Sequence, residues 1–283
     1  MRVLLPTDFS ENAWHAIQYA IYLFENIPCS FYILHAHQPA PSGLVSTINK
    51  ERDTRFHQIT QDEVEVKLQK IVGHLKSINK VTDHSFEAIL ESDSLLNTIG
   101  RNIIDKDIDF ICMGTQGASG MKEIFMGSNT VSVLKSINFC PLLAIPGSFD
   151  FTKPSQIVFA TDYKHLYQKV ELEPMISLAN IWNSTIRVIH MPGEAALTKE
   201  NEEIKKLLAR LLKGVSHSFE IIEYHPMIAY RINEWADENK SDLLVMINSQ
   251  HGFFRRLLRE PVIKKVAFKT HIPFLVLPEA NNS

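Results

Sequence analysis

Short runs of apolar residues alternate along the chain with longer segments in which apolar residues recur every three or four positions. The runs predict buried strands, and the longer segments predict amphipathic helices that pack on them. In the first half we expect strands at 3–5, 31–34, 86–90, 109–113 and 141–146, and helices at 10–24, 54–78, 94–106 and 127–137. Strands that alternate with helices form parallel βαβ units with right-handed crossovers.

The second half of the chain repeats this order. Thr7-Asp8-Phe9 is matched by Thr161-Asp162-Tyr163, and Leu34-His35 is matched by Ile189-His190. The later strands of the first half are matched by 242–246 and 273–278. The second copy is about 22 residues shorter, and we expect the difference in its second crossover. The fold class predicted is therefore α/β, with two tandem five-stranded parallel-sheet domains at 1–148 and 149–283.

Composition agrees with two soluble domains. The chain has 283 residues, of which 45% are hydrophobic and 22% charged, as in ordinary globular proteins. Its net charge of −3 lacks the basic excess with which nucleic-acid binders neutralise phosphates. The three cysteines are widely spaced, and no apolar run is long enough to span a bilayer. We expect a cytoplasmic protein with neither nucleic acid nor membrane as a partner.

A glycine-rich segment follows the expected fourth strand. Gly114 and Gly117 precede Gly127-Ser128 in the pattern G-x2-G-x9-G-S, which is neither the dinucleotide G-x-G-x-x-G motif nor a Walker A loop. Glycines let backbone N–H groups approach a ligand, and a helix N-terminus favours an anion. Because ligands bind where the strand order reverses, we expect Asp8 and Gly114 to lie together at a phosphate site. Glycines that only form turns are the alternative.

These residues together resemble the ATP-binding branch of the universal stress protein family. The resemblance is carried by the glycine motif and by the segments 4–10, 34–36, 109–114 and 141–146. It covers essentially the whole chain, once in each half. It implies Rossmann-like domains of the adenine nucleotide α-hydrolase type, and it implies that the last strands of the two domains pair within the chain. Whether two chains pair further as a homodimer stays open.

The resemblance also implies a nucleotide site in the first half. Asp8 would contact the adenosine, with Pro6 and Thr7 beside it, and the backbone of Ala36 would hold the adenine. The ribose and phosphates would lie against Met113, Gly114, Gly117, Gly127, Ser128, Asn129 and Thr130. The implied ligand is ATP, with AMP and ADP as alternatives and Mg²⁺ as an optional companion. The family often has a basic residue where this chain has Gln116.

The second half departs from the motif at the site itself. Ile247 stands where Gly114 stands, and Arg259-Glu260-Pro261 falls where Gly127-Ser128-Asn129 falls. Proline has no N–H to offer, and Glu260 would place a negative charge beside a phosphate. We predict that this half does not bind ATP in the family's manner, although it retains Asp162. The basic segment 255–269 is either a solvated helix face or a surface for an anionic partner.

Other candidate sites carry weaker signals. His35 and His37 would point to one side of a strand end, which permits a metal ion, strand-end packing or adenine contact. No third ligand is evident, so we assign no metal. Cys112 and Cys140 should be buried and inert. The tryptophans should serve the core or an interface; they are Trp14, Trp182 and Trp235.

Three functions remain open at this stage. The first is a nucleotide-responsive regulatory or stress-resistance protein that binds ATP. The second is a slow ATPase or related nucleotide hydrolase, for which the sequence offers no positioned general base, so we assign no catalytic residue. The third is an interaction module that binds no ligand.

Overall fold

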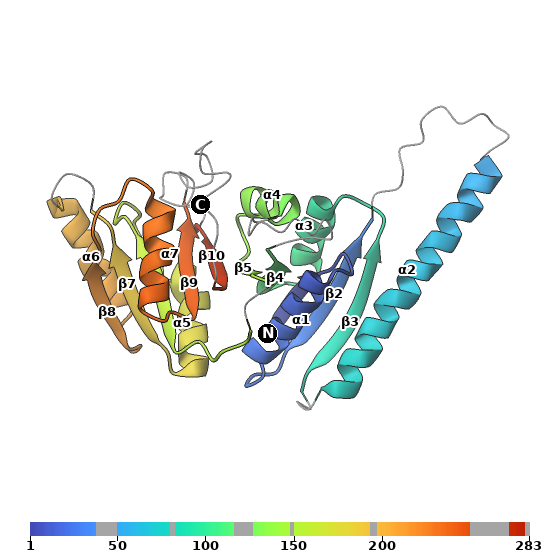
Figure 1. Cartoon of the computed structure of the whole chain (residues 1–283), viewed down its shortest axis with the longest axis horizontal. Coiled ribbons are helices and arrows are strands. Elements are labelled where there is room, and N and C mark those ends of the chain that lie inside the picture. Colours follow the sequence, from blue (N-terminus) through green and yellow to red (C-terminus); the bar gives the residue numbers. More distant parts are fainter. Residues whose placement is uncertain are drawn as a thin grey trace.

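The computed structural model describes residues 1–37, 50–79, 83–115, 127–147, 150–192, 197–249 and 272–280, with side chains described from residue 61 onward in the second helix. Ten strands form one sheet in the order β3-β2-β1-β4-β5-β10-β9-β6-β7-β8 (Figure 1). The first five are β1 (Arg2–Pro6), β2 (Ser30–Ala36), β3 (Ser85–Glu91), β4 (Phe110–Gly114) and β5 (Leu142–Ile145). The others are β6 (Gln156–Thr161), β7 (Thr185–His190), β8 (His217–Ile221), β9 (Leu243–Asn248) and β10 (Phe274–Pro278).

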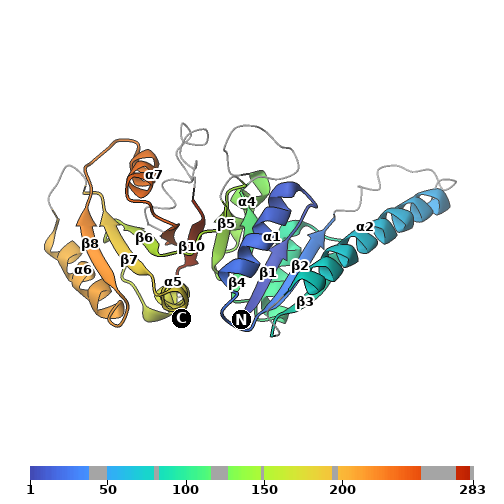
Figure 2. The same cartoon turned by 60° about the horizontal axis from the view of Figure 1, so that its bottom comes forward.

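Each set of five strands is parallel and doubly wound, which confirms the predicted fold class. The two sets meet where β5 and β10 pair antiparallel, with Leu143 opposite Leu275 (Figure 2). The expected pairing of the last strands within one chain is therefore present. The pairing covers one edge of each set, and an uncovered edge would otherwise be open to other chains.

Helices cover both faces of the sheet. One face carries α1 (Glu11–Leu23), α2 (Lys50–Ile78), α5 (Lys169–Trp182) and α6 (Lys199–Leu211). The other face carries α3 (Leu95–Asp105), α4 (Ser128–Ser136) and α7 (Ile228–Glu238). Alternate residues of a strand serve opposite faces, so Val3 and Leu5 join one core cluster and Leu4 joins the other. Burial on both faces explains why the strands are continuous apolar runs.

The second crossover accounts for the difference in length between the halves. Residues 37–84 connect β2 to β3, whereas residues 191–216 connect β7 to β8, so the second connection is 22 residues shorter, as expected. Helix α2 begins at Lys50, four residues before the predicted start. It extends beyond the end of the sheet (Figure 1). Leu68, Val72 and Leu75 are its buried apolar residues among those described.

Aromatic residues connect the two halves between α1 and α5. The indole N–H of Trp182 donates to the carbonyl of Leu23 at 3.0 Å, and the ring of Phe151 contacts both Trp182 and Tyr19. Trp182 is thus an interface residue, and Trp235 is buried in the core, as the sequence predicted. Trp14 is half-buried and contacts the ring of His74.

The cysteines are buried and free of disulfides. Burial raises the pKa of Cys140 to about 12 and raises that of Cys112 further above its ordinary value. Thiols that stay protonated are poor nucleophiles, which agrees with the predicted inert role. Among the described residues, no helix is both long and apolar enough to cross a membrane.

Candidate functional site

A cavity of about 320 Å³ opens at the carboxyl ends of β1 and β4. These neighbouring strands are where the first half reverses its strand order, since β1 pairs with β2 on one side and with β4 on the other. Chain connections leave such a point in opposite directions, and this leaves a crevice between them. Asp8 and Gly114 both line the cavity, so the expected juxtaposition is present.

Ten of the eleven binding residues predicted from the sequence line the cavity. They are Pro6, Thr7, Asp8, Ala36, Met113, Gly114, Gly127, Ser128, Asn129 and Thr130. Gly117 lies outside the described residues. The lining also includes Ala13 and Leu95, which sequence reasoning missed, and His35, which it singled out for other reasons. Ala13 and Leu95 begin helices that follow strands at this same edge, and that position was the available signal.

The first wall of the cavity is the turn after β1. Thr7 donates its N–H to the carbonyl of Leu34 at 2.8 Å, and its own carbonyl accepts a hydrogen bond from Nδ1 of His35 at 2.8 Å. Phe9 has a φ of 64° and places its ring 4.5 Å from that of His35. Burial lowers the pKa of His35. The carboxylate of Asp8 accepts from the N–H of Ser10 and belongs to an exposed residue.

The second wall joins the end of β4 to the start of α4. The hydroxyl of Thr130 donates to the carbonyl of Gly114 at 2.8 Å, and the N–H of Gly127 donates to the carbonyl of Thr115. Gly127 is the N-cap of α4 and has no side chain with which to cap it. The first residues of α4 therefore line the cavity, and their amides have no side-chain acceptor from their own cap, an arrangement that favours an anion.

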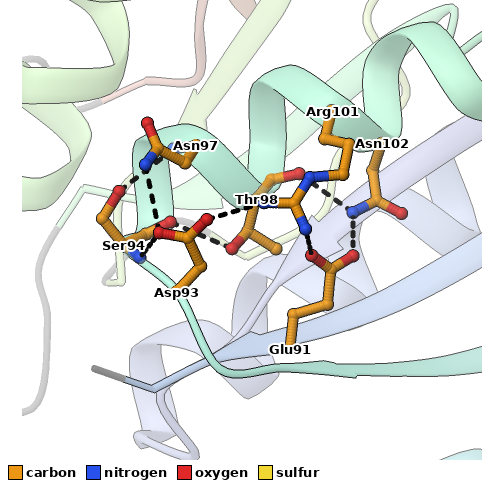
Figure 3. Close-up of polar contacts among 7 residues, drawn as sticks. All are labelled: Glu91, Asp93, Ser94, Asn97, Thr98, Arg101 and Asn102. Carbon is orange, nitrogen blue, oxygen red and sulfur yellow. Dashed lines mark hydrogen bonds and ion pairs between the residues drawn. The ribbon is translucent and has the colours of Figure 1, made fainter. Parts of the chain in front are cut away.

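The third wall is the start of α3, whose first residue, Leu95, lines the cavity. A polar network holds this end of the helix (Figure 3). Ser94 caps α3 by accepting from the N–H of Asn97 at 3.2 Å. Arg101 reaches back to Glu91 at 2.8 Å and to Asp93 at 2.6 Å. Hydrogen bonds from Ser94, Asn97 and Arg101 lower the pKa of Asp93. The carboxylates thus tie the end of β3 to the helix that supplies the cavity wall.

The second half repeats the strand-end contacts of the first. Nδ1 of His190 lies 2.9 Å from the carbonyl of Thr161, and the ring of Tyr163 stacks 4.5 Å from that of His190. The turn then differs, because seven residues, 162–168, precede α5, whereas four residues, 7–10, precede α1. Among these added residues, Tyr167 is buried and hydrogen-bonds the hydroxyl of Thr161.

The helices that follow these turns, α1 and α5, differ in their third residue. Ala13 and Glu171 are both third residues of their helices. Glu171 is 2% exposed. Its carboxylate accepts hydrogen bonds from the backbone N–H groups of Gln168 and Ala280 and from the ring of His165. Burial raises the pKa of Glu171, but these hydrogen bonds outweigh burial and lower it overall. Glu171, Glu279 and Lys164 are the charged lining of a cavity of about 510 Å³ here.

Further sequence differences between the halves involve residues 116 and 255–269. Arg259-Glu260-Pro261, the basic segment 255–269 and Gln116 all lie outside the described residues. Ile247, which stands in place of Gly114, is buried at the end of β9.

The histidine pair of β2 is engaged in local packing. The rings of His35 and His37 stack with centroids 6.5 Å apart, and Nε2 of His37 lies 3.1 Å from the hydroxyl of Ser92. In the described parts of the chain, no three His, Cys, Asp or Glu side chains are placed to hold a metal ion. The contacts show strand-end packing, and since His35 also lines the cavity, contact with an adenine stays a prediction.

The strand order and the position of the cavity define a doubly wound α/β protein with its cavity at the switch point. The model of the universal stress protein family matches residues 1–146 and 176–278. The chain belongs to this family. Universal stress protein MJ0577 of Methanocaldococcus jannaschii is 26% identical over 152 residues, which cover 48% of this chain and 90% of that protein.

Solved structures of tandem length share the fold. A universal stress protein from Archaeoglobus fulgidus covers 100% of this chain and 97% of its own, with 17% identity and a TM-score of 0.68. A putative universal stress protein from Pseudomonas aeruginosa covers 98% of this chain and 92% of its own, with 13% identity and a TM-score of 0.63. At these identities the likeness concerns the fold alone.

Proposed function

We propose that this protein binds one adenine nucleotide, ATP, in its first half and acts as a nucleotide-responsive regulatory protein in a stress response. The observation that carries the proposal is the meeting of β1, β4 and the start of α4 around one cavity. The family resemblance assigns ATP to the same set of residues. On this account the domains 1–148 and 149–283 have different roles.

The phosphates would lie at the start of α4. Ser128 and Asn129 offer backbone N–H groups there, and the helix dipole favours negative charge at this end. Hydrogen bonds to charged groups contribute about 1.5–3 kcal/mol each. Among the described lining residues Asp8 is the only carboxylate. Mg²⁺ held mainly by phosphate oxygens and water, with at most one protein carboxylate, suits this set.

The adenosine would occupy the other end of the cavity. Ala36 ends β2 and offers backbone groups, while Leu95 at the start of α3 offers apolar surface for a base. Thr7 and Asp8 lie between this apolar end and α4, where a ribose would fall. Apolar and backbone groups at the ends of β2 and β3, with the amides of α4 opposite them across β1, would suit the two ends of an adenine nucleotide.

The second half would remain without ATP. Glu171 is a buried carboxylate at the third position of α5, where α1 has Ala13, and Ile247 has a side chain where Gly114 has none. A phosphate beside the Glu171 carboxylate would meet repulsion in a poorly solvated position. The role left for this half is to support the first through the joined sheet.

Titration calorimetry with ATP tests this proposal on the full chain. Gly127→Val would put a branched side chain into the phosphate end of the cavity and lower the affinity at least about tenfold. Gly73→Val is the matched control, because a Cβ at Gly73 of α2 meets nothing within 4 Å. Unchanged ATP affinity in Gly127→Val would show that the site is wrongly assigned. ATP turnover that is lost in Asp8→Ala would instead favour a hydrolase.

A further inference from the structure

Helix α4 begins at the cavity of the first half and ends against the second half. Its first residues, Ser128 and Asn129, line the cavity. Near its other end the carbonyl of Leu134 accepts a hydrogen bond from the side-chain amide of Asn248 at 3.2 Å. Leu134 and Asn248 are 1% and 4% exposed, so this contact is shielded from water.

The contact satisfies a group that the helix itself leaves without a partner. The last four carbonyls of an α-helix have no N–H partner within it, and Leu134 lies within the last four residues of α4. A donor at this end also complements the negative pole of the helix dipole. Asn248 is itself held as the last residue of β9, paired with Pro278 of β10.

Packing reinforces the same connection. Val133 and Leu134 of α4 belong to one core cluster with Met246 of β9 and Phe274 of β10. A helix of nine residues is about 14 Å long and moves nearly as a rigid body. A shift at its carboxyl end is therefore carried to the amides at its start.

We propose that Asn248, which belongs to the second half, is a positioning residue for the phosphate-binding end of α4. This proposal rests on the nucleotide site proposed above and deepens it. The second half, without holding ATP, then sets the affinity of the first half for the phosphates. Sheet register places Asn248 where the first half has Thr115, since Ile145 pairs with Gly114 and Leu277 with Ile247.

The test compares the binding of ATP and of adenosine to Asn248→Ala. Loss of the amide donor should weaken ATP binding about three- to tenfold, the range of one hydrogen bond, and leave adenosine binding unchanged. Asn239→Ala is the matched control, because the side-chain amide of Asn239 likewise donates to a carbonyl near the end of a helix, that of Trp235 in α7. Asn248→Ser, whose hydroxyl is too short to reach Leu134, serves if the alanine variant unfolds.

Amide hydrogen exchange of Val131, measured without any nucleotide, separates this proposal from the proposed function, because the Val131 N–H donates to the carbonyl of Gly127 in the first turn of α4. Faster exchange in Asn248→Ala than in Asn239→Ala is expected. If the wild-type protein binds no ATP but exchange is still faster in Asn248→Ala, the positioning role is retained and the nucleotide site is rejected. Unchanged exchange, or an equal loss of ATP and adenosine affinity, would overturn the role of Asn248.

Discussion

Nδ1 of His35 lies 2.8 Å from the carbonyl oxygen of Thr7, and Nδ1 of His190 lies 2.9 Å from that of Thr161. Because a carbonyl oxygen only accepts, each ring donates from Nδ1. The contact ties the end of one central strand to its neighbour in both halves. The duplicated chain thus keeps one strand-end contact twice, but only the first copy lines the predicted nucleotide cavity.

Replacing His35 or His190 should therefore lower the stability of the fold in both cases, but should weaken ATP binding only for His35. His35→Ala and His190→Ala each leave a carbonyl without its donor and should lower the free energy of unfolding by about 1–3 kcal/mol. His35→Ala should also weaken ATP binding, because Thr7 and Asp8 lose their support. Urea unfolding and calorimetry measure the two effects. Equal loss of ATP affinity in both variants would contradict the assignment of the site to the first half.

The buried carboxylate of Glu171 predicts a pH dependence of stability. Its pKa in the folded protein lies below the ordinary value of 4.5, so the folded state favours the deprotonated form. The stabilisation is fully present above about pH 4.5 and is lost as the pH falls through the lower folded pKa. Glu171→Gln should lower the free energy of unfolding at pH 7 by about 1.5–3 kcal/mol, and the difference from wild type should shrink in acid.

Glu173→Gln is the control for this measurement, because Glu173 lies on the same helix and is exposed. It should change the free energy of unfolding little at any pH. A Glu171→Gln variant with wild-type stability across the whole pH range would show that the carboxylate is not held as the contacts suggest.

The cap of α3 should matter for binding as well as for stability. Ser94→Ala removes the side-chain acceptor of the Asn97 N–H and should cost about 0.5–2 kcal/mol. It should also weaken adenosine binding, because α3 supplies Leu95 to the cavity. Thr198→Ala removes the same kind of side-chain cap from α6 in the second half and should lower the melting temperature without changing adenosine affinity. If Ser94→Ala and Thr198→Ala bind adenosine with the same affinity, α3 is not a wall of the site.

The junction of β5 and β10 predicts that the halves recognise each other. Residues 1–148 and 149–283, expressed as separate chains, would each leave a central strand without its partner. They should associate as a one-to-one complex in size-exclusion chromatography after mixing. Halves that stay apart and soluble would show that the antiparallel strand pair contributes little to holding the chain together.

Periodicity sufficed to predict the alternation of strands and helices, because burial on both faces makes each strand an uninterrupted apolar run. The offset between matched segments of the two halves located the shortened crossover. The pattern placed the start of α2 four residues too late, because residues 50–53 are all charged and add nothing to an apolar period. A helix end without apolar residues leaves little trace in such a pattern.

The site was predictable where it depends on glycine and on strand ends, as at Gly114 and Gly127. It was not predictable where it depends on groups that fold back from elsewhere. Glu171 reads in sequence as an ordinary helix residue, and only the fold brings Ala280 and His165 to its carboxylate. Asn248 likewise lies 114 residues from its acceptor, Leu134.

Mass spectrometry of nucleotide released from ATP-saturated full chain, with protein quantified in the same sample, tests the central claim most directly. The account predicts one adenine nucleotide per chain in the wild type and clearly less in Gly127→Val. Two nucleotides per chain would contradict the proposed difference between the halves, and none in the wild type would contradict the nucleotide site itself.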